Sequence, residues 1–215
     1  MARSLRLKDW CEFLALLFCQ RPVSCLSVLP MTMIKTPDGD VAVEEIIVGA
    51  SVQTLDNGPQ KVWMILKREL DFKTAPCHLK PIKFEDESLG SGRPSRPLMV
   101  SPQHRMLVKD PLGNSVLVPA KSLTQRRGIR VAHGVRQITY FHLVFSRHEV
   151  IIANDTPTES SFPGAMALKA IPKACHSEIL EIFGIDDVMR PDDLTMIAAP
   201  ILHFQDAKRQ AFSFV

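Results

Sequence analysis

The 215-residue sequence lacks a strong excess of charge of either sign, since 26 lysines and arginines face 23 aspartates and glutamates. A net charge of +3 is too small to predict the dense basic surface on which nucleic-acid binding depends. Aromatic residues make up only 7% of the chain and Tyr140 is its single tyrosine, which argues against a stacking platform for single strands. We therefore expect no nucleic-acid partner.

Paired cysteines are absent as well. None of the five cysteines belongs to a Cys-x-x-Cys motif, and three of them fall within the first 25 residues. An odd number of cysteines without a regular framework argues against a disulfide scaffold and favours a reducing compartment.

A long hydrophobic run is also missing. Residues 1–26 begin with basic residues and continue into an apolar stretch, but its uninterrupted part, residues 13–19, is seven residues long. A membrane-spanning helix needs about 20 residues, so we expect no membrane span. Asp9 and Glu12 lie where the apolar part of a secretory signal begins, which favours a short amphipathic leader. The localisation stays open between cytoplasmic and secreted.

From residue 32 onwards the chain does contain a series of short strands. Apolar segments are separated by turn signals such as Asp56-Asn57-Gly58-Pro59. The expected strands are 32–35, 41–43, 51–55, 61–72, 79–84, 98–100, 105–108, 115–118, 138–145 and 149–153, the last two closing the unit, with one helical turn at 120–125. Because no helices separate these strands, we predict an all-β, mostly antiparallel unit rather than a parallel sheet.

The pattern changes after Pro163-Gly164. Residues 165–170, 177–183 and 202–212 predict short helices that prolines interrupt. We expect residues 165–215 to form a helical tail that packs on the β unit or frays, and that is dispensable for the core.

One polar turn between two expected strands carries groups suited to chemistry. Ser101 lies three residues before His104, between the apolar segments 98–100 and 106–108. At this spacing the hydroxyl can hold the carbonyl or amide of a peptide group while the imidazole protonates its leaving nitrogen. Taken alone, the four residues also fit an ordinary turn with a polar cap.

Other short motifs occur in a fixed order around this turn. They are Thr36-Pro37-Asp38-Gly39 with 43–56, then 56–60, 98–104, 118–121 and 139–154. Together they resemble the bacterial subgroup of the Hint domain family, the self-processing module shared by inteins and Hedgehog C-terminal domains. The resemblance covers residues 27–164 and implies a horseshoe-shaped, antiparallel β unit preceded by a leader, residues 1–26.

The resemblance also implies a reaction. In this family the residue that opens the domain attacks the carbonyl of the preceding residue, and an N-to-S or N-to-O acyl shift converts the amide into a thioester or ester. By this resemblance Ser27 is the nucleophile and the Leu26–Ser27 peptide is the bond attacked, with Ser101 and His104 activating it. The substrate is the chain's own upstream polypeptide, the acceptor is water or an unidentified nucleophile, and no cofactor is implied.

Two further histidines, His142 and His148, flank the connection between the last two expected strands. The resemblance assigns assistance in later steps to a histidine in this region, although either could instead be structural. Ser146 stands where an acidic residue is expected, and Glu149 could take its place. A metal hydrolase built on His104 and these two histidines is disfavoured, because metal-ligand spacing and a carboxylate partner are not evident.

The chain departs from the family pattern at the opening position. Where the family usually has cysteine, an aromatic residue and, further on, glycine, this chain has Ser27, Val28 and Met31. A serine hydroxyl is a poorer nucleophile than a thiolate, and a methionine is strained if its φ must be positive. Cys25 is a nearby thiol, two residues out of register. The alternative is therefore a degenerate, inactive Hint fold that serves as a β scaffold or interaction module.

Features needed for full protein splicing are absent. An intein ends in His-Asn followed at once by a nucleophile, whereas Asn154 follows Ala153 and the chain continues beyond Gly164. The sequence therefore predicts cleavage, or transfer to an outside nucleophile, rather than splicing.

Overall fold

Strands make up most of the regular structure in residues 27–160 and 199–214, the residues that the computed structural model describes. They are β1 (Met33–Thr36), β2 (Gly39–Ala42), β3 (Ser51–Gln53), β4 (Pro59–Lys61), β5 (Met64–Asp71), β6 (Ile82–Phe84), β7 (Leu98–Val100), β8 (Arg105–Lys109), β9 (Ser115–Pro119), β10 (Ile129–Val131), β11 (Gln137–Val144), β12 (Val150–Ala153), β13 (Thr156–Glu159) and β14 (Ser213–Phe214). Short 3₁₀ turns at Val43–Glu45, Cys77–Leu79 and Ala120–Leu123 and one α-helix, α4 (Phe204–Arg209), complete the described structure. All pairs between these described strands are antiparallel, so the predicted all-β, mostly antiparallel class is confirmed.

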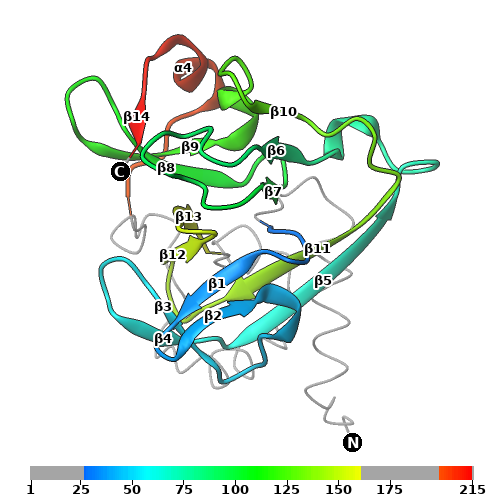
Figure 1. Cartoon of the computed structure of the whole chain (residues 1–215), viewed down its shortest axis with the longest axis vertical. Helices are drawn as coiled ribbons and strands as arrows, with labels where there is room; N and C mark the ends of the chain where they lie inside the picture. The colour runs from blue at the N-terminus through cyan, green and yellow to red at the C-terminus, as the bar shows by residue number, and fades with distance from the viewer. Residues whose placement is uncertain (1–26, 161–198, 215) are drawn as a thin grey trace, which may run out of the picture.

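The largest sheet joins the beginning of the β unit to its end. Its strand order is β14-β8-β13-β12-β1-β2, and β9 pairs with β8. Ile34 of β1 lies opposite Ala153 of β12, although the two strands are far apart in the sequence. Figure 1 shows β12 and β13 between an upper group of strands, which includes β6 to β9, and a lower group, which includes β1 to β5.

The hydrophobic core follows from the alternation of side chains along these strands. Ile82 and Phe84 of β6 are buried, whereas Lys83 between them is partly exposed, as expected for a strand with one face on the core. Leu98 and Val100 of β7 continue the same layer. Burying each such side chain stabilises the fold by about 1.5–3 kcal/mol.

The prediction that residues 149–153 form the last strand was wrong. β13 follows β12 directly and pairs with it across Asn154-Asp155, whose φ angles are +46° and +60°. Its sequence, Thr-Pro-Thr-Glu, has no apolar alternation, yet all four residues are buried. A polar strand that is buried on both faces carries no periodic signal, which is why the pattern failed here.

The described part of the tail packs against the β unit. α4 lies within the helix expected at residues 202–212 but is shorter, and the chain then adds β14 to the edge of β8. Ala207 and Phe212 belong to the same core as β6 and β7, and Arg126 Nη1 donates a 2.7 Å hydrogen bond to the Phe212 carbonyl. The leader, 1–26, and the helices expected at 165–170 and 177–183 lie outside the described residues. Within residues 27–160 and 199–214, no helix is long and apolar enough to cross a membrane.

Candidate functional site

The residues that open the β unit are held between two strands. Val28 bridges Val100 of β7 and Phe141 of β11. Its amide donates to the Phe141 carbonyl at 3.1 Å, and the Phe141 amide donates back to the Val28 carbonyl at 2.9 Å. The apolar Val28 side chain is buried, so core packing fixes the chain immediately after Ser27.

This anchoring puts Ser27 beside the polar turn singled out in the sequence. The Ser101 amide donates a 2.9 Å hydrogen bond to the Ser27 carbonyl, and the His104 amide closes the turn onto the Ser101 carbonyl at 3.1 Å. β7 ends at Val100 and β8 begins at Arg105, so the turn is the connection between two core strands. All three residues, Ser27, Ser101 and His104, are at most 2% exposed.

His104 is uncharged at neutral pH. Its burial lowers the pKa of the imidazole to about 3, and electrostatic interactions with His142, Arg105 and His148 act in the same direction. The His104 Nε2 atom is hydrogen-bonded to Thr158 Oγ1 of β13. The Thr158 hydroxyl in turn donates to the Arg105 carbonyl at 3.0 Å.

Ser27 Oγ and His104 Nδ1 are buried without a hydrogen-bond partner, as is Arg105 Nε on the residue after His104. Buried polar atoms in folded proteins are usually satisfied, because leaving one unpaired costs about 1–3 kcal/mol. A hydroxyl and an imidazole nitrogen left open on two elements that touch are therefore available for interaction with a reacting group.

The other two predicted histidines are connected to this centre less directly. His148 Nε2 lies 3.3 Å from Glu159 Oε2, and Arg105 Nη1 binds the same oxygen at 3.0 Å. His142 lies on β11 next to Phe141, is half-buried, and contributes to the lowered pKa of His104. Direct contacts thus join the Ser27, Ser101 and His104 group, while His148 reaches it through Glu159 and Arg105.

Thr158 and Glu159 are site residues that the sequence analysis missed. Glu159 is the carboxylate that contacts His148, with Oε2 3.3 Å from Nε2. Glu149 instead accepts a 2.8 Å hydrogen bond from Asn57 Nδ2, which ties a surface turn to β12. Thr158 and Glu159 both lie on β13, whose sequence has no apolar alternation that could have marked it as a strand.

Met31 occupies a strained position close to the opening residue. Its φ is +64°, in the left-handed region that favours glycine. Both carboxylate oxygens of Glu44 accept a hydrogen bond from the Met31 amide, at 3.0 and 2.9 Å. The turn where the family usually has glycine therefore keeps its conformation with methionine, with the side chain 79% exposed.

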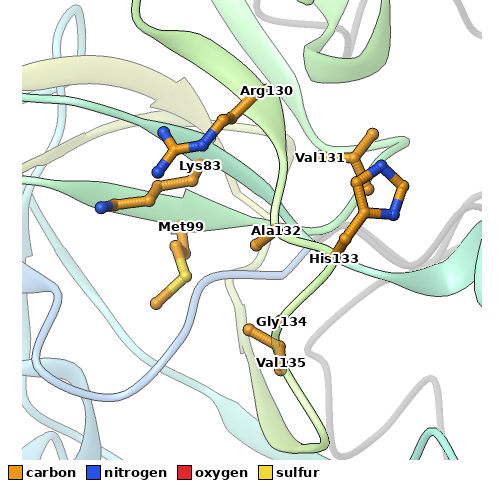
Figure 2. A pocket seen from close by; sticks show the side chains of 8 residues that line it. All are labelled: Lys83, Met99, Arg130, Val131, Ala132, His133, Gly134 and Val135. Atoms are coloured by element: carbon orange, nitrogen blue, oxygen red, sulfur yellow. The ribbon is translucent and has the colours of Figure 1, made fainter.

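A pocket of about 480 Å³ lies near the opening segment but outside this centre (Figure 2). Its lining includes Met99, whose carbonyl accepts the Leu29 amide, together with Lys83 and Arg130 from paired strands. Lys83 and Arg130 both bind Glu85, and these two bonds hold the pKa of that carboxyl below its usual value. One carboxylate offsets only one of the two positive charges, so the Lys83, Arg130 and Glu85 group keeps a net charge of +1.

A second cavity of about 670 Å³ is lined by Leu29, Pro30 and Met99 among others. Among the described lining residues of both cavities there is none of the five predicted site residues. The described part of the chain also contains no group of three or more histidine, cysteine, aspartate or glutamate residues that could hold a metal ion. Cys77 is its single described cysteine and carries a free, exposed thiol, while Cys25 lies outside the described residues.

Solved structures with a similar fold are inteins and intein-like domains. A bacterial intein-like domain from Clostridium thermocellum is 16% identical, with a TM-score of 0.41 over 63% of this chain and 98% of that chain. A splice-inactive variant of the AceL NrdHF class 3 split intein is 17% identical, with a TM-score of 0.44 over 63% and 99%. The gp41-1 intein is 15% identical, with a TM-score of 0.39 over 61% and 96%.

No curated protein matches the chain. The Hint domain model, in contrast, matches residues 26–165, from the residue before Ser27 to beyond the end of β13. This match spans well over half of the sequence and contains the whole Ser27, Ser101 and His104 centre. The chain therefore belongs to the Hint domain family.

Proposed function

We propose that this Hint domain cleaves its own chain between Leu26 and Ser27 by an N-to-O acyl shift, with residues 27–164 as the processing unit. The observation that carries the proposal is the pair of buried, unpartnered atoms, Ser27 Oγ and His104 Nδ1, on two segments joined by the Ser101–Ser27 hydrogen bond. A nucleophile and a base left open at the residue that follows the cleaved bond are what this chemistry requires.

In the first step a bond forms between Ser27 Oγ and the carbonyl carbon of Leu26. The hydroxyl proton passes to Nδ1 of the neutral His104, and the Ser101 hydroxyl polarises the carbonyl that is attacked. The C–N bond then breaks, and the imidazolium returns its proton to the departing nitrogen. The products are an ester on Ser27 Oγ and a free α-amino group, with His104 again neutral.

The low pKa of His104 suits the second half of this step. A pKa of about 3 leaves the resting imidazole neutral, so Nδ1 is free to accept a proton. Once protonated, the same group is a strong acid and gives the proton readily to the amide nitrogen, which is otherwise a poor leaving group.

Water or an outside nucleophile resolves the ester, and His142 and His148 assist this later step. Splicing would require Asn154 to cyclise by attack of its own side-chain nitrogen. That nitrogen donates to the Pro97 carbonyl at 3.1 Å, while Asn154 Oδ1 accepts the Met33 amide at 2.7 Å. These bonds support a structural role for the Asn154 amide. The proposed reaction therefore releases the upstream segment and does not join it to a downstream segment.

The test is the intact mass of freshly purified full chain, with and without hydroxylamine, which attacks esters. We expect fragments 1–26 and 27–215 from the unmodified chain and none from Ser27→Ala. Ser27→Cys should cleave faster and respond to dithiothreitol, because a thiol with a pKa near about 8.5 supplies some thiolate at neutral pH. A single uncut species in every variant, Ser27→Cys included and with the fold intact, would favour the scaffold alternative.

A further inference from the structure

We propose that Thr158 is a positioning residue that holds His104 with its proton on Nε2 and so keeps Nδ1 open for the proton transfer. This inference deepens the proposed function and rests on it for its catalytic meaning. Its structural part, the protonation pattern of the ring, can be measured whether or not the chain cleaves.

The hydrogen bonds of the Thr158 hydroxyl define the tautomer. A hydroxyl has one proton to donate, and Thr158 Oγ1 contacts three groups that can accept it: the Arg105 carbonyl at 3.0 Å, Met106 Sδ at 3.6 Å and an unprotonated His104 Nε2. Donation to Nε2 would place the ring proton on Nδ1, where a buried N–H donor would have no partner, and would leave the Arg105 carbonyl without the hydroxyl proton. Donation to the Arg105 carbonyl satisfies both contacts, because Thr158 Oγ1 then accepts from His104 Nε2–H. The proton in that contact belongs to the imidazole.

The charge state of the ring completes the assignment. Burial and the neighbouring charges keep His104 neutral, so the ring carries a single proton. The charged or titratable groups around it are Arg105 on β8, His142 on β11, His148 before β12 and Glu159 on β13. With the single proton on Nε2, Nδ1 carries a lone pair, and this is the ring atom that has no hydrogen-bond partner.

Hydrogen bonds to the backbone of Arg105 fix the position of the Thr158 hydroxyl. Glu159, the next residue of β13, accepts a hydrogen bond from the Arg105 amide, while Thr158 donates to the Arg105 carbonyl. The side chains of Thr158 and Glu159 therefore bind the backbone carbonyl and the backbone amide of Arg105. Thr158 is 0% exposed, so water does not compete for its hydroxyl.

The consequence for the reaction is specific. A ring with its proton on Nδ1 cannot accept the Ser27 proton at that atom, and its open Nε2 faces β13 instead of the opening residue. A hydroxyl on Thr158 that selects the productive form explains why a polar side chain is buried in the sheet at this point. Thr156, two residues earlier on the same strand, is equally buried but bonds only to the Asn154 carbonyl, at 3.4 Å.

The experiment measures the ¹⁵N resonances of the His104 ring in the full-length Ser27→Ala protein, which cannot cleave. We expect a protonated Nε2 and an unprotonated Nδ1 from pH 5 to 8. In Ser27→Ala with Thr158→Val the Nδ1-protonated form should gain population, Thr158→Ser should restore the original pattern, and Thr156→Val should leave it unchanged. A proton on Nδ1 in the parent overturns the assignment even if Thr158→Val fails to fold, and so does an unchanged ring in a folded Thr158→Val.

Cleavage rates in the native Ser27 background form the second readout. Thr158→Val should be slower by about tenfold or more, as part of the roughly 10²–10⁴-fold that a positioned acid or base supplies, with Thr158→Ser and Thr156→Val close to the parent. Cleavage unaffected by Thr158→Val overturns the inference while the proposed function stands. An Nε2-protonated ring in a chain that never cleaves, even with Ser27→Cys, supports the tautomer assignment and defeats the proposed function alone.

Discussion

Asn154 at the closing end of the β unit and the Ser27–His104 pair at its opening end differ in whether their buried polar atoms have hydrogen-bond partners. At the closing end, Asn154 uses both atoms of its side-chain amide, on the Met33 amide and the Pro97 carbonyl. At the opening end, Ser27 Oγ and His104 Nδ1 have no hydrogen-bond partner. The first arrangement stabilises a fold, because every donor and acceptor that loses water gains a partner. The second does not stabilise the fold and leaves two groups open for another purpose.

The difference separates residues that hold the unit together from residues that can react. The contacts of Asn154 tie the β12–β13 turn to β1 and to the loop before β7. We expect changes at the closing end to alter stability with little effect on chemistry. Changes to the Ser27 and Ser101 hydroxyls should alter chemistry with little effect on stability.

The largest expected effect is at the opening end. His104→Ala should slow cleavage by about 10²–10⁴-fold, because it removes the group that accepts and returns the proton. Ser101→Ala should have a smaller effect, since it removes one polarising hydrogen bond. The measurement is the rate of appearance of fragment 27–215 by mass spectrometry. His133→Ala, an exposed histidine in the pocket of Figure 2, is the matched control and should cleave at the parent rate.

The closing end should respond in stability instead. Asn154→Ala removes two short hydrogen bonds and puts alanine at a φ of +46°, so we expect a loss of about 2–4 kcal/mol in the free energy of unfolding. Denaturant unfolding of the uncleavable Ser27→Ala protein measures it. Asp155→Gly, in the same turn and only half-buried, removes the ion pair with Lys35 but relieves a φ of +60°, so it should change stability less than Asn154→Ala. A cleavage rate that falls in the folded Asn154→Ala protein would mean that the two ends are not separate in role.

Acid should destabilise the fold through His104. Its folded pKa of about 3 lies below the unfolded value of about 6.5, so the unfolded state binds more protons in the interval between them. The contribution of His104 to the free energy of unfolding is therefore fully present above pH 6.5. It falls as the pH drops from 6.5 towards 3, by up to about 1.4 kcal/mol per pH unit. Unfolding free energies of Ser27→Ala from pH 7 to 4 should show this slope. Adding His104→Gln should flatten it, and identical slopes in the two proteins would contradict a neutral, buried imidazole.

Much of the strand arrangement could be predicted from the sequence wherever apolar and polar side chains alternate. Most strands with apolar alternation were found, with boundary errors of a few residues, as was the Ser101–His104 turn between β7 and β8. β10 (Ile129–Val131) was missed, because three residues are too few for a periodic signal. The family motifs carried the assignment of Ser27, which no local pattern distinguishes from other serines. The structure adds that Ser27 and Ser101 are neighbours through their backbones.

β13 escaped prediction as well. A buried strand made of Thr156, Pro157, Thr158 and Glu159 looks like a polar loop, because its burial comes from long-range packing between β12 and β8. The same holds for β14, which is two residues long and exists only as a partner of β8. Whether the tail is dispensable stays a prediction, and the burial of Ala207 and Phe212 indicates that its described part adds to the core.

The smallest expected effect concerns the turn that connects the opening residue to β1. Met31 holds a φ of +64°, which disfavours any residue with a Cβ by about 1–2 kcal/mol, and Glu44 stabilises the turn through the Met31 amide. Met31→Gly relieves the backbone strain but makes the unfolded chain more flexible, by about 0.5–1 kcal/mol. We therefore expect a net gain of up to about 1 kcal/mol in the free energy of unfolding, measured in the Ser27→Ala protein. The exposed Met31 side chain contributes little packing that would offset this gain.

Glu44→Gln should act in the opposite direction, because a neutral amide accepts the Met31 hydrogen bond more weakly than a carboxylate does. A loss of stability in Met31→Gly would show that the methionine side chain, and not the backbone, determines this turn.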